Sequence, residues 1–135
     1  MQNPSHLPSQ RWLLVHTLAI AFSLSHVILD WWAGLLAPPG DTMTGTGMLF
    51  LALSVGIYAL WANALVLASH GSRWWLGVTI GVSAVSSLNG FAIVYCLPPC
   101  LFPVGDLSHI GSLIFCLWAI FESWLALQQR ASVRP

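Results

Sequence analysis

Four long apolar stretches dominate the chain and leave little of it for anything else. They cover residues 12–36, 48–69, 74–97 and 104–127 of 135. A bilayer core about 30 Å thick needs roughly 20 mostly apolar residues per helix, and each stretch is long enough. The connections between them are short, and two of the three contain proline, which ends helices. We therefore expect an all-α fold, an integral membrane four-helix bundle, with residues 1–135 as one domain.

The composition agrees with a membrane protein and excludes several other classes. Hydrophobic residues make up 57% of the chain and charged residues 6%, whereas a soluble domain has about a quarter charged residues. The net charge is zero, with no run of either sign. Nucleic acid is therefore not an expected partner, because no basic surface is available to bind it. The expected surroundings are the lipid bilayer.

The arginines predict the orientation of the spans. Arg11, Arg73, Arg130 and Arg134 all fall on one side of a four-span chain, and the loops on the other side contain no Lys or Arg. The positive-inside rule then puts both termini in the cytoplasm of a bacterial inner membrane or a plasma membrane. We expect the first span to be retained, since no clear Ala-x-Ala cleavage site follows it.

Ionisable residues toward the outer ends of the first and last spans are the main candidate site. His26 and Asp30 are spaced i, i+4, and Asp106 and His109 are spaced i, i+3. Such residues at membrane depth usually face the bundle interior. If the two spans are adjacent, His26, Asp30 and His109 are candidate metal ligands, or a proton relay. Packing of a buried His–Asp pair is an alternative, as is Asp106 serving as a helix cap.

Two further ionisable residues lie toward the cytoplasmic side. His16 shares a face of the first span with His26 and Asp30, and Glu122 lies near its depth in the last span. Glu122 can pair with His16, or it can reach the cytoplasmic boundary, which we favour because the span ends shortly afterwards. Together these residues also suggest a path for a proton or small solute, which so small a bundle would form as an oligomer.

Cysteines and small residues complete the candidates. Cys96 and Cys100 would face an oxidising compartment, where a structural disulfide is the preferred interpretation over free thiols or a redox pair. Gly77, Gly81 and Ala84 form a small-residue face that permits close helix packing. A second face of the same span carries the serines Ser83, Ser86 and Ser87. One of these faces can pack within the bundle, and the other can bind a partner.

The expected function follows from the size of the chain and its short loops. We expect a non-catalytic accessory subunit or ligand-binding helix bundle, acting as a homo-oligomer or within a larger membrane complex. The alternatives are metal, haem or pigment binding at the outer His/Asp cluster, and proton or small-solute transport. No nucleophile motif surrounds any serine, so a hydrolase is the least supported class. The sequence does not specify a cofactor.

Overall fold

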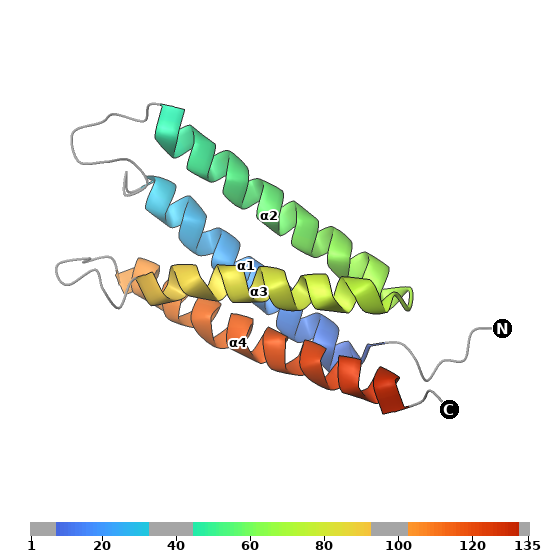
Figure 1. Cartoon of the computed structure of the whole chain (residues 1–135). Helices are drawn as coiled ribbons and strands as arrows, with labels where there is room; N and C mark the ends of the chain where they lie inside the picture. Colours follow the sequence, from blue (N-terminus) through green and yellow to red (C-terminus); the bar gives the residue numbers. More distant parts are fainter. Residues whose placement is uncertain (1–7, 33–44, 93–102, 133–135) are drawn as a thin grey trace.

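The described part of the chain is entirely helical. A computed structural model describes residues 8–32, 45–92 and 103–132, and these contain four helices and no strand. The helices are α1 (Gln10–Trp32), α2 (Gly45–Ser69), α3 (Arg73–Ala92) and α4 (Pro103–Ser132) (Figure 1). The predicted all-α class is confirmed.

Local sequence explains where two of the helices begin and end. The Ser9 hydroxyl accepts a hydrogen bond from the Trp12 backbone N–H (3.1 Å), which caps the start of α1. At the end of α2, Gly71 has a φ of 99°. The backbone N–H groups of Gly71 and Ser72 donate to the carbonyls of Ala68 and Leu67. This pattern is a Schellman motif, and its left-handed position is accessible to glycine without strain.

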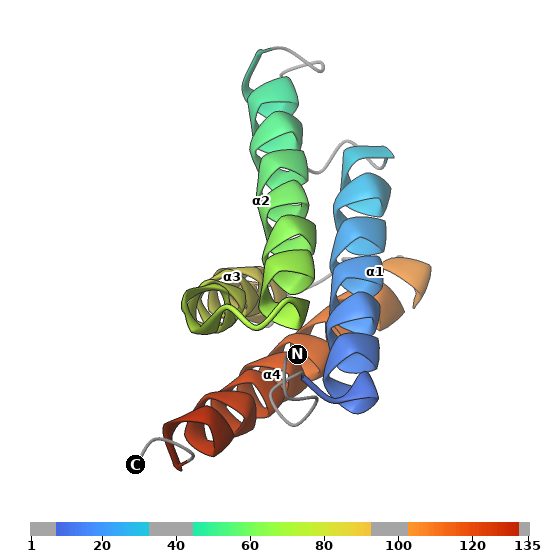
Figure 2. The ribbon, with the colours of Figure 1, turned by 90° about the vertical axis from the view of Figure 1, so that its right-hand side faces the viewer.

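The four helices pack with α1 and α3 lying between α2 and α4 (Figures 1 and 2). The most extensive contacts are those of α4 with α1 and with α3. The start of α1 and the end of α4 lie at the same end of the bundle, together with the short turn between α2 and α3 (Figure 1). The end of α1, the start of α2, the end of α3 and the start of α4 lie at the other end (Figure 1).

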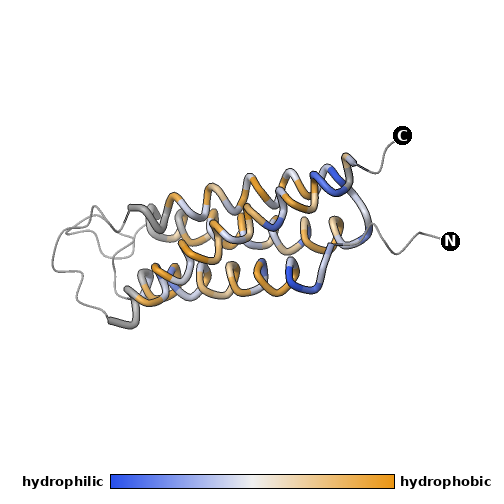
Figure 3. Tube along the Cα trace, turned by 90° about the horizontal axis from the view of Figure 1, so that it is seen from below, coloured by the Kyte–Doolittle hydropathy of each residue, from blue (hydrophilic) through white to orange (hydrophobic). Residues whose placement is uncertain are grey.

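Three helices are long and apolar enough to cross a membrane, judged by length and composition. The qualifying segments are Gln10–Leu29, Leu51–Ser69 and Leu107–Gln129. Large apolar side chains such as Leu53, Val85 and Ile110 have about half of their surface exposed, as expected where lipid replaces water. Apolar positions predominate along the helices, and hydrophilic ones gather toward the end where α1 starts (Figure 3).

Helix α3 is on average as apolar as α1, and its two faces differ. The buried face carries Thr79, Ser83, Ser86 and Ser87. Gly77 and Gly81, which we predicted as packing residues, are exposed, and a methyl group added at either would meet no atom within 4 Å. Ala84 is half-buried. The serine face is therefore the one packed inside the bundle.

Candidate functional site

A buried hydrogen-bond network joins all four helices near the end where α1 starts. Its members are Trp12 and His16 from α1, Trp61 from α2, Thr79 from α3 and Ser123 from α4. Each is at most 1% exposed. Ser123 is at the centre, because its Oγ lies 2.9 Å from Trp12 Nε1, 2.8 Å from His16 Nε2 and 3.0 Å from Thr79 Oγ1. We call these five residues the inner network.

The donors determine where each hydrogen of the inner network lies. Trp61 Nε1–H donates to His16 Nδ1 (3.0 Å), so the neutral imidazole carries its hydrogen on Nε2 and donates it to Ser123 Oγ. Trp12 Nε1–H donates to the same oxygen. Thr79 donates to the Leu76 carbonyl (2.8 Å), which leaves Thr79 Oγ1 to accept from Ser123. Every polar hydrogen in the inner network thus has an acceptor.

A second polar group lies midway along the bundle. The hydroxyls of Ser23 and Ser112 are 2.6 Å apart, and Cys116 Sγ is 3.5 Å from Ser23 Oγ. Tyr58 donates its hydroxyl hydrogen to the Ser23 carbonyl (3.2 Å). Cys116 is fully buried, in agreement with the small, packed role expected for a buried free cysteine. Cys96 and Cys100, the candidate disulfide, lie outside the described residues.

The outer histidines come together between α1 and α4. The ring centroids of His26 and His109 are 4.0 Å apart, with the ring planes tilted by 46°. His26 is buried and His109 half-buried. The helix positions of Asp30 and Asp106 lie one turn farther out, but their side chains are outside the described part of the structure. Among the described side chains, no three His, Cys, Asp or Glu residues group closely enough to hold a metal ion.

Glu122 does not pair with His16, which corrects one of the two arrangements considered from the sequence. Both ring nitrogens of His16 are engaged by Trp61 and Ser123. Glu122 Oε1 instead lies 2.8 Å from Arg11 Nε and accepts a hydrogen bond from Trp118 Nε1 (3.0 Å). Glu122 is 7% exposed, so the favoured arrangement, a side chain that reaches the boundary, is corrected as well, and the exposed Arg11 guanidinium pairs with a buried carboxylate.

Aromatic rings continue from this ion pair along the seam between α1 and α4. The Arg11 guanidinium carbon is 5.4 Å from the Trp118 ring centroid. The Trp118 and Phe115 centroids are 6.3 Å apart, and those of Phe115 and Phe22 are 5.2 Å apart. Phe22 lies so close to α4 that a side chain at Gly111 would collide with its ring. Glycine at position 111 therefore permits this close approach.

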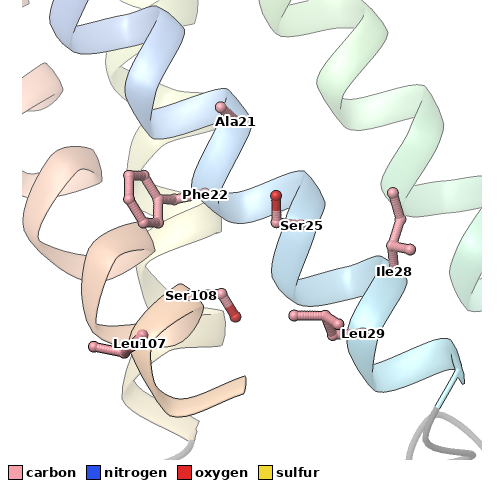
Figure 4. A pocket seen from close by; sticks show the side chains of 7 residues that line it. All are labelled: Ala21, Phe22, Ser25, Ile28, Leu29, Leu107 and Ser108. Atoms are coloured by element: carbon pink, nitrogen blue, oxygen red, sulfur yellow. The ribbon is translucent and has the colours of Figure 1, made fainter. Parts of the chain in front are cut away.

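Beyond Phe22 the seam opens into a groove between α1 and α4, with a volume of about 590 Å³. Its walls are mainly apolar, with two serine hydroxyls, one from each helix (Figure 4). The lining residues are Ala21, Phe22, Ser25, Ile28, Leu29, Leu107 and Ser108. Several of these are exposed on the outer surface of the bundle. The groove thus offers mainly apolar contacts together with two hydroxyl groups.

The sequence pointed to His16 as a candidate, but not to the two tryptophans of the inner network. Trp12 stands at the start of an apolar span, a position typical of a tryptophan at the membrane boundary, yet it is buried and bonded to Ser123. Trp61 has no sequence neighbour that marks it as a donor. The available signal was its position far from either end of an apolar span, where a tryptophan N–H needs a buried acceptor.

Comparison with known proteins supplies no further assignment. No protein-family model, no curated protein and no solved structure matches this chain.

Proposed function

We propose that this protein is a four-span, non-catalytic membrane protein that binds an apolar or amphiphilic molecule in the groove between α1 and α4. The inner network is the observation that carries the proposal. Every polar hydrogen of the inner network has an acceptor within the bundle. These hydrogen bonds hold the four helices together. They also leave the inner network without a free donor that could act on a substrate. The groove is then the feature of the described residues best suited to a ligand.

Two observations support counting α3 as a fourth span. Three crossings would put the start of α1 and the end of α4 on opposite sides of the membrane, whereas they lie at the same end of the bundle (Figure 1). Helix α3 is also as apolar on average as α1, and its buried serines pack between helices, where their hydroxyls do not meet lipid. With four spans, the arginine distribution supports an orientation with both termini in the cytoplasm of a bacterial inner membrane or plasma membrane.

Transport along α1 is less well supported than ligand binding. A proton moving through His16 would have to disrupt its bonds to both Trp61 and Ser123. Ser23 lies between His16 and His26 on α1, and its hydroxyl is hydrogen-bonded to that of Ser112. These bonds favour a fixed polar core over a conducting path.

The chemistry of the groove indicates its occupant. The walls contributed by Phe22, Ile28 and Leu29 favour an acyl or isoprenoid chain, and they border the lipid from which such a molecule would enter. Ser25 and Ser108 supply hydroxyls for a small polar group (Figure 4). An amphiphilic lipid therefore fits both the lining and the location.

Native mass spectrometry of the detergent-purified protein tests this proposal. Ala21→Trp should fill the groove, whereas Ala59→Trp places the same bulk at an exposed alanine of α2. We expect one lipid to be retained by the wild type and by Ala59→Trp, and at least fivefold less by Ala21→Trp. A wild type that carries no lipid, or equal retention in the two variants, would contradict groove binding.

A further inference from the structure

A narrow stripe of mostly small residues runs along the exposed face of α2. Its members are Ala52, Gly56, Ala59, Asn63 and Val66, and each is exposed. They are separated alternately by four and three residues, so at about 100° per residue they fall within an arc of about 80°. A methyl group added at Gly56 would meet no atom within 4 Å. This alternation is typical of a helix that packs lengthwise against another helix, and we call these five residues the α2 stripe.

The α2 stripe faces away from the rest of the bundle. The opposite face of α2 packs inward through Tyr58, Trp61 and Leu65, which are buried. Helix α2 lies at the edge of the bundle, with α1 and α3 between it and α4 (Figure 2). Its apolar segment is also the least buried of the three segments that are long enough to cross a membrane. Within the described part of the chain, the α2 stripe is therefore left uncovered.

Asn63 gives the α2 stripe a polar group that needs a partner. Its Nδ2 donates one hydrogen to the Ala59 carbonyl of the same helix (2.8 Å). The other amide hydrogen and Oδ1 have no hydrogen bond to the described residues. Asn63 lies within the apolar segment Leu51–Ser69, about 9 Å from its end at about 1.5 Å per residue. An exposed side chain at that depth in a membrane meets lipid, which offers the amide no hydrogen bond.

We propose that the α2 stripe is the interface of a homodimer, in which α2 packs against α2 of a second copy and the two Asn63 side chains hydrogen-bond to each other. A carboxamide contains both donors and an acceptor, so the Asn63 of a second copy supplies both groups that the first one lacks. Two copies with the same topology are related by a two-fold axis along the membrane normal. This symmetry makes the two α2 helices parallel and brings each Asn63 to the same depth.

The rest of the α2 stripe suits the same arrangement. Alanine and glycine at three of its positions allow two helix backbones to approach closely, and it carries no charge that would oppose itself across a two-fold axis. An asparagine in such a repeat fixes the register and the number of helices in coiled coils. A partner of different sequence would have to offer a polar group at the same depth, whereas a second copy supplies it by symmetry.

Disulfide cross-linking in vesicles tests which face of α2 forms the interface. Ala59→Cys and Leu60→Cys are each made in a chain whose natural cysteines are replaced by alanine, and the folded variants are oxidised in phosphatidylethanolamine–phosphatidylglycerol vesicles. Leu60 is the matched control, because it is exposed at nearly the same depth but points about 100° away from Ala59. We expect Ala59→Cys to form a covalent dimer at least about fivefold more efficiently than Leu60→Cys, because only the α2 stripe meets itself across the axis.

Energy transfer between chains tests the role of Asn63. Chains that retain their natural cysteines carry a donor or an acceptor fluorescent protein at the C-terminus, and the dimer is followed as the ratio of lipid to protein is raised. Asn63→Leu removes the amide and should weaken the dimer about five- to tenfold, the order expected for hydrogen bonds between helices in membranes. Asn63→Gln keeps the donors and the acceptor and should stay within about twofold of the wild type.

The proposal is overturned if the wild type shows only the energy transfer of randomly placed chains, if Leu60→Cys cross-links as well as Ala59→Cys, or if Asn63→Leu dimerises as tightly as the wild type. It does not rest on lipid binding, because α2 contributes no residue to the groove. Ala59→Trp should therefore lose the dimer and keep the lipid, and Ala21→Trp should lose the lipid and keep the dimer.

Discussion

Ser123 is the residue on which the inner network most depends. Its single oxygen accepts from both Trp12 and His16, and its hydrogen goes to Thr79. Removing the hydroxyl leaves two N–H donors at fully buried positions without their acceptor. Such loss costs about 1–3 kcal/mol per group in water-soluble proteins, while hydrogen bonds measured within membranes average about 0.6 kcal/mol.

Ser123→Ala should therefore lower the free energy of unfolding by about 1–3 kcal/mol. The measurement is detergent-induced unfolding in mixed micelles, followed by circular dichroism. Ser25→Ala is the control, because Ser25 is exposed and exposed substitutions usually change stability by less than about 0.5 kcal/mol. Equal effects of the two substitutions would show that the inner network does not stabilise the bundle.

At this scale the sequence predicts which polar residues turn inward but not which partners they choose. His16 lies in an apolar span, so its burial follows from the cost of exposing a polar ring to lipid. Its hydrogen-bond partners are Trp61 and Ser123 because the rotation of α2 and α4 presents those side chains. Glu122 pairs with Arg11 for the same reason. Helix rotation is a tertiary property that spacing within one span does not encode.

Among the helices, the α1–α4 pair carries the outer histidines, the groove and the ion pair. Its close approach depends on Gly111, where any added side chain meets the Phe22 ring. The four-residue spacing of Gly77 and Gly81 is instead the pattern typical of close packing, yet both glycines are exposed. Gly111 lacks such a partner, and the need for glycine there arises from an aromatic ring on another helix.

Gly111→Ala should destabilise the bundle by about 1–3 kcal/mol, the usual cost of overpacking. Gly77→Ala has open space around the new methyl group and should stabilise the monomer by up to about 1 kcal/mol, because alanine favours helix more than glycine does. Both are measured by the unfolding assay used for Ser123. A neutral Gly111→Ala would show that Phe22 can move aside without loss.

For the whole molecule, the sequence predicts an all-helical membrane fold because apolar length alone requires it. It does not fix how far each span extends. The last span was expected to end at residue 127, yet α4 continues to Ser132, since its final polar turns extend past the apolar segment. The packing of the whole bundle likewise decides that Gly77 and Gly81 are exposed. Their small side chains form a surface that a second helix can approach closely.

Topology is the property of the whole molecule most open to a direct test. Four crossings require the end of α4 and the turn between α2 and α3 to lie on the same side as Arg11, and the α1–α2 and α3–α4 connections to lie on the other. Green fluorescent protein fused after residue 135 should fluoresce in bacteria, because it folds in the cytoplasm. Alkaline phosphatase fused after residue 40 or 98 should be active outside, and after residue 71 inactive.

If α3 did not cross, phosphatase fused after residue 98 would be inactive, and the C-terminal fluorescent fusion would be dark. That result would put the start of α1 and the end of α4 on opposite sides of the membrane, although the fold holds them at the same end of the bundle. The reporters therefore test both whether α3 crosses and whether α1 packs on α4 as described.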